Sequence, residues 1–510
     1  MAASPQAEMQ ALSRAQIKSL LPRWLREELA VLRHEFDQEL YLSGGSLRDL
    51  LLGRVPHDMD LTIAQGAQRF AQKLAERTGG ACICLDAEED VARVVSHGLV
   101  IDVAAFREGA GTIEEDLRLR DFTINALAVS LDDFFDEQER DGAIAGATVL
   151  TLLDPCNGLA DIRARRIRMT HEAAFRSDPL RMLRAYRLAA TLACSVDTTT
   201  REVIAREHAL IRRSAAERIA AELNALMLSP RAHAAIQAMR VDGVLFEVLP
   251  ELAAGEGVQQ PASHHLDVFG HSLEALRQVE LLIAEPELGF PDCSPLMRTW
   301  LGDADNILFL KWAALLHDLG KPATWAQDAG RGGRITFHQH EQAGVALVQA
   351  LARRLRWSTR QMERISLLIG QHMRPFHLLN VARPGELSLK ACIRLVKAVG
   401  SELPGLLLLA QADALAGKGE LRPEDMEGEV AGLALRLEEV QRERVLPVQS
   451  SPPLVNGRDL IDTLGLEPGP LFRTVLDAVE LARMEGVIAS KDEALGLART
   501  LAAQAEMGGD

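Results

Sequence analysis

Aromatic residues are scarce in this 510-residue chain: they occupy 4% of its positions, and tyrosine occurs only twice. This scarcity disfavours a binding module that stacks successive bases on aromatic side chains. The six cysteines show no Cys-x-x-Cys spacing, so we expect free thiols and a cytoplasmic location. No long apolar run suggests a membrane span, because the stretch 406–410 is too short and Asp413 soon follows. The run Met1 to Glu8 lacks the basic and apolar regions of a signal peptide.

The net charge of −16 argues against a nucleic-acid partner, but the charge is unevenly distributed. A basic island lies between Asp161 and Arg187, where eight arginines face only three acidic residues. This island is either a solvated helix face with internal ion pairs or a phosphate-binding surface. Its arginines are Arg163, Arg165, Arg166, Arg168, Arg176, Arg181, Arg184 and Arg187.

The length predicts several domains, and the periodicity of apolar residues changes along the chain. Helical spacing over 24–32 and 67–77 alternates with strand patterns over 40–42, 58–63, 81–85, 91–96 and 99–105, which predicts an α+β head. A capping box is expected at Thr112 to Glu115. Beyond about residue 155 the pattern is almost wholly helical. We therefore predict an unassigned segment 1–29, a head over 30–155, a helical neck over 156–262, a third domain over 263–425 and a helical tail over 426–510.

Two aspartates one residue apart, Asp58 and Asp60, follow closely on a Gly44-Gly45 turn. On a strand the two carboxylates point the same way, and a cation such as Mg²⁺ would relieve their repulsion. The glycines allow a close approach to phosphate, and Ser46 is expected to cap a helix over 47–52. The alternative is a solvated strand face without metal.

The Gly-Gly-x-x-Arg-Asp segment at 44–49, ahead of Asp-x-Asp, resembles the nucleotidyltransferases related to DNA polymerase β. Within them it is similar to class II tRNA nucleotidyltransferases and bacterial poly(A) polymerases. The resemblance implies a small mixed sheet with helices, and transfer of a nucleoside monophosphate from NTP to an RNA 3′-hydroxyl. It assigns two Mg²⁺ to the paired aspartates and a third ligand or base to Asp102, for which a surface strand residue is the alternative. The phosphate cradle would be Gly44, Gly45, Ser46 and Arg48.

A second motif, Arg120-Asp121-Phe122-Thr123-Ile124-Asn125, resembles the signature that contacts the ribose and triphosphate in this family. The resemblance places Arg120, Asp121 and Asn125 in the nucleotide site. Leu119 stands where the family has a first arginine, so we expect recognition of the ribose to depart from the family's usual pattern.

The segment Ser177-Asp178-Pro179-Leu180-Arg181 resembles the Glu-Asp-x-x-Arg element of class II enzymes, with Ser177 in place of the glutamate. An aspartate and an arginine one helical turn apart offer acceptors and donors that can imitate a Watson-Crick edge. The resemblance implies that Asp178 and Arg181 select CTP or ATP, with Arg184 and Arg187 nearby. A plain salt bridge is the alternative.

The third domain carries adjacent His317 and Asp318 on an apolar helix, which resembles the HD phosphohydrolases. In the family's order the further ligands are His271, His340, His372 and Asp413. Imidazole with carboxylate suits Mn²⁺, Fe²⁺, Ni²⁺, Co²⁺ or Zn²⁺. The resemblance implies phosphatase or phosphodiesterase activity on nucleotides or RNA ends.

Resemblance extends from about Leu40 to Leu497, including the tail around Gly457 to Pro470. It implies an enzyme that adds C and/or A to the 3′ end of tRNA from CTP and ATP, with no membrane partner. One alternative is a poly(A) polymerase, and another is a metal phosphohydrolase whose head only binds nucleotide or RNA. The choice among CCA, CC and A addition, the HD metal and the oligomeric state are left open.

Overall fold

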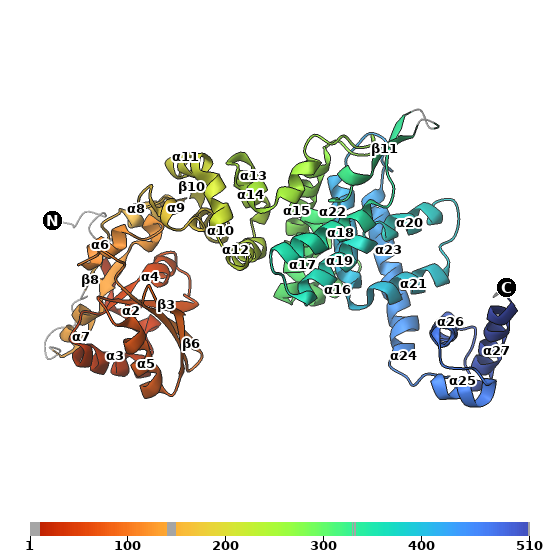
Figure 1. The fold of residues 1–510 in the computed structure, drawn as a ribbon, viewed down its shortest axis with the longest axis horizontal. Coiled ribbons are helices and arrows are strands. Elements are labelled where there is room, and N and C mark those ends of the chain that lie inside the picture. The colour runs from red at the N-terminus through yellow and green to blue at the C-terminus, as the bar shows by residue number, and fades with distance from the viewer. Residues whose placement is uncertain (1–10, 140–148, 329, 331–332, 508–510) are drawn as a thin grey trace. The chain divides into compact units, whose positions relative to one another are not determined.

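The computed structural model describes residues 11–139, 149–328, 330 and 333–507 (Figure 1). The run Met1 to Glu8 lies outside these residues. The chain divides into two compact units, one of residues 1–229 with 238–248 and one of residues 230–237 with 249–510. Within the described ranges, no helix combines the length and the apolar character needed to cross a membrane.

A mixed sheet organises the first unit, and its eight described strands follow the order β1-β8-β7-β2-β3-β6-β5-β4. Only β3 and β6 pair in parallel; the other described neighbours are antiparallel. The predicted strands over 91–96 and 99–105 are confirmed with the same bounds. The strands are β1 (Ala11–Ser13), β2 (Tyr41–Ser43), β3 (Asp58–Ile63), β4 (Ala81–Asp86), β5 (Val91–Ser96), β6 (Leu99–Ala105), β7 (Ala128–Ser130) and β8 (Val149–Leu153).

One face of this sheet packs on helices, and the alternation of apolar and polar residues along the strands determines which face is covered. Met59, Leu61 and Ile63 of β3 are buried, as are Ala92 and Val94 of β5, whereas the residues between them reach the opposite face. Helix α5 packs on β5 and β6, and α3 packs on α5. The helices of the head are α2 (Arg14–Leu20), α3 (Arg23–Phe36), α4 (Gly44–Leu51), α5 (Ala67–Thr78), α6 (Ile113–Arg118), α7 (Leu131–Glu139) and α8 (Gly158–Arg163).

Two local predictions of helix caps need correction. Helix α4 begins at Gly44 after Ser43, so Ser46 lies inside the helix and does not cap it. The glycines at 44 and 45 enter the helix themselves, which moves its start three residues earlier than predicted. At α6, Thr112 caps Glu115 as predicted, but the Glu115 carboxylate accepts from Gly111 N–H, so the reciprocal half of the capping box is absent there.

The neck is a set of short helices that belong to the first unit, except that residues 230–237 belong to the second. Helix α10 packs on α12 through a buried face that includes Leu183, Tyr186 and Leu223. Tyr186 Oη donates to Asp242 Oδ2 at 2.7 Å, which joins α10 to the end of α13. The neck helices are α9 (Ala174–Ser177), α10 (Arg181–Leu192), α11 (Thr198–Glu207), α12 (Ala216–Leu228), α13 (Ala232–Val241) and α14 (Val244–Val248).

The second unit is helical apart from the hairpin of β11 (Trp325–Asp328) and β12 (Arg334–Phe337) in its described part. Helices α15 (Val268–Ala284), α17 (Ala304–Leu316) and α22 (Leu403–Ala416) pack on one another, and α17 and α22 are buried along almost their whole length. Around them lie α16 (Ser294–Leu301), α18 (His340–Arg354), α19 (Thr359–Gln371), α20 (Arg374–Ala382), α21 (Leu389–Val399) and α23 (Met426–Val440).

The tail forms a small cluster at the end of this unit. Its helices α25 (Gly457–Leu464), α26 (Pro470–Glu485) and α27 (Lys491–Met507) lie together (Figure 1) around a core that includes Leu460, Val475 and Ala498. Helix α24 (Leu446–Gln449) precedes them, and Lys397 of α21 pairs with Glu480 of α26.

Candidate active site and candidate metal centre

Six aspartates line one cavity of about 590 Å³ in the first unit, and three of them lie on neighbouring strands of the sheet. Asp58 and Asp60 lie on β3, and Asp102 of β6 is the direct neighbour of Asp60 in the parallel register. Residues paired in this way project to the same side of a sheet, which is the side opposite to α5. The structure therefore brings together the three aspartates that the sequence singled out.

The glycine turn approaches the Asp60 carboxylate very closely. Gly44 has φ of +66°, a conformation that L side chains rarely adopt. A Cβ on Gly44 would lie 3.0 Å from Asp60 Oδ2, and one on Gly45 would lie 3.1 Å from the same atom. The Ser46 N–H donates to Asp60 Oδ2 at 3.0 Å, and Asp60 N–H donates to Ser46 Oγ at 2.6 Å. Ser46, in the first turn of α4, thus fixes Asp60 through two hydrogen bonds, one to its carboxylate and one to its backbone N–H.

The electrostatics at β3 fit a divalent cation. Burial and the nearby charge of Asp58 raise the pKa of Asp60, which the Ser46 N–H and Arg120 oppose. Two crowded carboxylates of this kind are stabilised as anions by a cation between them, and Mg²⁺ takes one or two carboxylates with phosphate oxygens and water. Asp58 and Asp60 have the donor chemistry that such an ion requires.

Asp102 is held by a residue that sequence reasoning missed. Arg93 of β5 donates to both Asp102 oxygens, at 2.7 and 2.8 Å. Arg93 and Asp102 are direct partners in the antiparallel β5–β6 register. The alternation of Val91 to Ser96 could have placed Arg93 on the polar face, but only the strand pairing identifies its partner. Further cavity residues that were missed are Arg54, His57 and Arg107.

Arg120 lies buried beneath the glycine turn. Its guanidinium donates to Asp116 Oδ2 at 3.1 Å, to Ser43 Oγ at 3.1 Å and to Thr62 Oγ1 at 3.0 Å. A Cβ on Gly44 would lie 3.1 Å from Arg120 Nη1. Arg120 therefore connects β2, β3 and α6 behind the carboxylates, and it also lines the cavity.

A polar chain crosses the cavity from Arg48 to the neck. Arg48 Nη1 donates to Asn125 Oδ1 at 2.8 Å, and Asn125 Nδ2 donates to Asp121 Oδ1 at 3.0 Å. Arg184 Nη1 lies 3.4 Å from Asp121 Oδ2. Burial acts to raise the pKa of Asp121, but Arg184 and the hydrogen bonds outweigh it and lower that pKa. Asp121 is therefore an anion that orients groups from both the head and the neck.

The neck contributes four predicted residues to the same cavity: Asp178, Arg181, Arg184 and Arg187. Asp178 Oδ2 accepts from Arg218 at 2.8 Å, and Arg187 Nε donates to Glu222 Oε2 at 2.6 Å. Burial lowers the pKa of Arg181, and Asp121 opposes this shift. The other five arginines of the basic island, Arg163, Arg165, Arg166, Arg168 and Arg176, do not line the cavity.

A second polar cluster lies in the second unit, where three histidines have fixed tautomers. His317 Nδ1 donates to Ala314 O at 2.9 Å, His340 Nδ1 to Phe337 O at 2.9 Å and His372 Nδ1 to Ile369 O at 2.6 Å. A carbonyl can only accept, so in the neutral imidazole each Nε2 presents a lone pair. Histidines that bind a metal ion through one ring nitrogen usually donate a hydrogen bond from the other to a carboxylate, a backbone carbonyl or water.

The Nε2 atoms of four histidines converge on the carboxylate of Asp318. Asp318 Oδ2 lies 3.2 Å from His317 Nε2 and 3.6 Å from His271 Nε2. Asp318 Oδ1 lies 3.4 Å from His340 Nε2 and 3.8 Å from His372 Nε2. The two oxygens of one carboxylate thus serve two groups of imidazoles.

Two further contacts complete this cluster. His271 Nε2 lies 2.9 Å from Asp413 Oδ1, and His340 Nε2 lies 3.1 Å from His372 Nε2. Two imidazole lone pairs at that separation repel unless a proton or a metal ion lies between them, and burial lowers the pKa of His372 to about 3. The six residues therefore fit a transition-metal site and adjoin a cavity of about 650 Å³. Sequence reasoning missed Lys321, whose Nζ lies 2.7 Å from Asp318 Oδ2, and His264, which lines the cavity.

Comparison with known proteins gives three family matches along the chain. Residues 40–168 match the family described as the poly(A) polymerase head domain, and residues 268–417 match the HD domain. Between them, residues 195–255 match the family described as the probable RNA and SrmB-binding site of polymerase A. The match to the head domain contains strand β3 with its carboxylates, and the match to the HD domain contains the histidine cluster.

Similar proteins cover nearly the whole chain. An A-adding tRNA nucleotidyltransferase of Deinococcus radiodurans is 34% identical over 458 residues, which are 89% of this chain and 93% of the relative. A CC-adding tRNA nucleotidyltransferase of Thermus thermophilus is 32% identical over 88% of this chain and 91% of its own. The solved Thermotoga maritima CCA-adding enzyme complexed with tRNA is 20% identical with a TM-score of 0.60, over 97% of this chain and 99% of that one, and it shares the fold. The chain therefore belongs to the tRNA nucleotidyltransferase family and is a nucleotidyltransferase with an HD domain.

Proposed function

We propose that this enzyme adds C, A or both to the 3′ end of tRNA, with CTP and ATP as nucleotide donors. The observation that carries the proposal is the cavity where Asp58 and Asp60 meet the glycine turn of α4 and the arginines of α10. Carboxylates for cations, backbone N–H groups for phosphate and arginines for a base are the parts that nucleotidyl transfer requires. Relatives at 34% and 32% identity are named A-adding and CC-adding enzymes, which supports tRNA as the acceptor.

Asp58 and Asp60 would hold two Mg²⁺ ions in this mechanism, with Asp102 as a third carboxylate. When bound, such ions act as Lewis acids that lower the pKa of the attacking hydroxyl and neutralise the departing pyrophosphate. The protein's part is to fix the carboxylates, and Ser46 and Arg93 do so through the hydrogen bonds to Asp60 and Asp102. Fixed charges of this kind need no reorganisation during the reaction.

The triphosphate and sugar would lie against Gly44, Gly45, Ser46 and Arg48, next to Asp121 and Asn125. The N-terminus of α4 carries a partial positive charge that favours an anion. Arg120 would support this cradle from beneath, because most of its donors are taken by Asp116, Ser43 and Thr62. Asp121 would keep Arg184 oriented toward the nucleotide.

Base selection would fall to Asp178 and Arg181, with Arg184 and Arg187 beside them. An aspartate accepts and an arginine donates hydrogen bonds, so together they can pair with the edge of cytosine or adenine. Asp178 is bonded to Arg218 here, so reading a base through Oδ2 would need this contact to be exchanged or shared.

The HD domain supports a second candidate activity, hydrolysis of phosphate esters at a metal site. Its six residues His271, His317, Asp318, His340, His372 and Asp413 would hold Mn²⁺, Fe²⁺, Co²⁺, Ni²⁺ or Zn²⁺, which activate water when bound. The observation that supports this activity is the convergence of four imidazole Nε2 atoms on the buried Asp318 carboxylate. The carboxylate site and this cluster lie in different compact units, so the two activities would be separable.

The test uses three tRNA substrates, which lack CCA, CA or A at the 3′ end. The enzyme is incubated with CTP and ATP together, and the 3′ ends are sequenced. We expect addition that stops when the terminus is complete. A long oligo(A) product on unrelated RNA would instead support a poly(A) polymerase, and no incorporation on any RNA would leave only the phosphohydrolase.

A further inference from the structure

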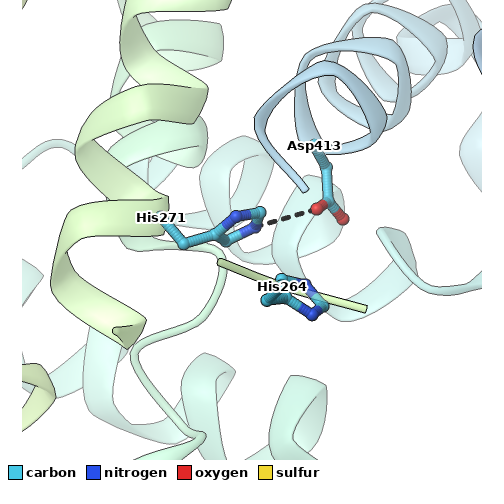
Figure 2. Close-up of side chains that lie close together, drawn as sticks. All are labelled: His264, His271 and Asp413. Atoms are coloured by element: carbon cyan, nitrogen blue, oxygen red, sulfur yellow. Dashed lines mark hydrogen bonds and ion pairs between the residues drawn. The ribbon is translucent and has the colours of Figure 1, made fainter. Parts of the chain in front are cut away.

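His264 approaches the histidine cluster of the HD domain from a segment that precedes α15. Its ring centroid lies 4.7 Å from that of His271, with the two planes at 79°. Figure 2 shows His264 beside His271 and Asp413, and the latter two are joined by a hydrogen bond. His264 also lines the 650 Å³ cavity that adjoins the cluster, so it lies at the border between the buried ligands and the space for a substrate.

The ligand atoms of His264, His271 and Asp413 all lie within 4.8 Å of one another. Two metal–ligand bonds of about 2.0–2.2 Å span at most about 4.4 Å, so side-chain shifts of a few tenths of an ångström or less bring all three atoms within reach of one ion. His264 Nδ1 lies 3.1 Å from Ser263 Oγ, and the ring forms no other hydrogen bond with the described residues. If the serine hydroxyl accepts the Nδ1 proton, Nε2 is left with a lone pair for a metal ion.

The backbone around His264 is anchored to the segment that follows α22, the helix that carries Asp413. Gly419 N–H donates to Ser263 O at 3.0 Å, and Leu421 N–H donates to Ala262 O at 3.1 Å. A Cβ on Gly419 would lie 2.3 Å from Ala262 O, so this close approach requires glycine. The position of His264 relative to Asp413 is therefore built into the fold and is not that of a free loop residue.

We propose that His264 is a further ligand of the metal centre in the HD domain, on the side formed by His271 and Asp413. This inference rests on the proposed metal site. Asp318 divides the cluster: its Oδ1 faces His340 and His372, while its Oδ2 faces His271. His264 joins the second side and would bind an ion together with His271 and Asp413, with Mn²⁺, Fe²⁺, Co²⁺ or Ni²⁺ as the chemical class.

The test is titration of the metal-free full-length protein with Co²⁺, read by its visible absorption and by calorimetry. Wild type is compared with His264→Ala, with His265→Ala as the matched control and with Asp318→Ala as the reference for a disabled HD site. His265 is the exposed chain neighbour of His264 and does not line the cavity. Circular dichroism of each metal-free variant checks the fold, and His264→Gln replaces His264→Ala if the latter is misfolded.

We expect His264→Ala to weaken one class of Co²⁺ sites by about tenfold or more and to change the absorption band, because an imidazole ligand is lost. His265→Ala should match wild type in both. The inference is overturned if His264→Ala and His265→Ala give the same isotherm and spectrum while both differ from Asp318→Ala. If wild type itself matches Asp318→Ala, the HD domain binds no Co²⁺, and the proposed metal site fails together with the inference.

Discussion

Replacing Gly44 with alanine tests whether the glycine turn controls the position of the Asp60 carboxylate. Gly44 has φ of +66°, and an L residue in that conformation costs about 1–2 kcal/mol. The added Cβ would also lie 3.0 Å from Asp60 Oδ2 and 3.1 Å from Arg120 Nη1, closer than such atoms normally approach. The backbone cost affects folding, whereas the crowding acts on the carboxylate that would bind the metal ion.

Gly79→Ala separates these two effects. Gly79 ends α5 with φ of +65°, but a Cβ there would meet nothing within 4 Å. Both variants should therefore lose a similar free energy of unfolding, which corresponds to a fall in Tm of about 2–4 °C per kcal/mol. Only Gly44→Ala should displace the reacting groups.

Steady-state incorporation of labelled CMP or AMP into truncated tRNA is the assay, with Tm measured on the same samples. We expect Gly44→Ala to lower kcat on the order of 10- to 100-fold, because a displacement of about 1 Å can cost that much. Gly79→Ala should retain the wild-type kcat. Equal kcat values for the two variants at equal Tm would refute the idea that the turn holds Asp60 in place.

Three further predictions concern the surroundings of the carboxylates. Arg93→Ala should lower kcat for incorporation about tenfold with little change in KM for nucleotide, because Asp102 loses the two hydrogen bonds that fix it; an unchanged kcat across a Mg²⁺ titration would contradict this. Arg181→Ala should raise KM for CTP and ATP in initial-rate assays, whereas Arg163→Ala, an exposed arginine outside the cavity, should not; equal KM values would remove base selection from Arg181. The charges of Arg107 and Arg120 outweigh the effect of burial and lower the pKa of Asp116 below its usual 3.8. The ionised carboxylate therefore stabilises the fold above about pH 4, and this stabilisation is lost as the pH falls further. Asp116→Asn should therefore lower Tm more at pH 7 than at pH 3.5, and a loss independent of pH would show that the charge is not what matters.

The parts of the site that follow from local sequence were predictable. Alternation along a strand is enough to place Asp58 and Asp60 on one face, opposite to the buried Met59, and the structure confirms that placement. In the HD domain, His271 and His340 likewise lie on predicted helical segments, and His317 and His372 directly follow the helices α17 and α19. Such features depend on residues within a few positions of one another.

The parts that depend on distant pairing were not predictable from one sequence. Arg93 is identified as the partner of Asp102 only by the register of two antiparallel strands. The helix cap predicted at Ser46 is wrong because a glycine with positive φ starts α4 earlier than residue preference suggests. His264 lies in a loop, and the backbone contacts that hold it come from residues more than 150 positions later in the chain.

Asp60→Asn in the full-length enzyme tests the central claim most directly, because it removes one charge with almost no change in volume. The variant and wild type are given truncated tRNA, CTP, ATP and Mg²⁺, and incorporation is measured beside hydrolysis of a phosphomonoester with Co²⁺. We predict that incorporation is lost while any hydrolysis measured for wild type persists, since the two sites lie in different compact units. Incorporation at the wild-type rate by Asp60→Asn would contradict the assignment of the carboxylate pair as the polymerising centre.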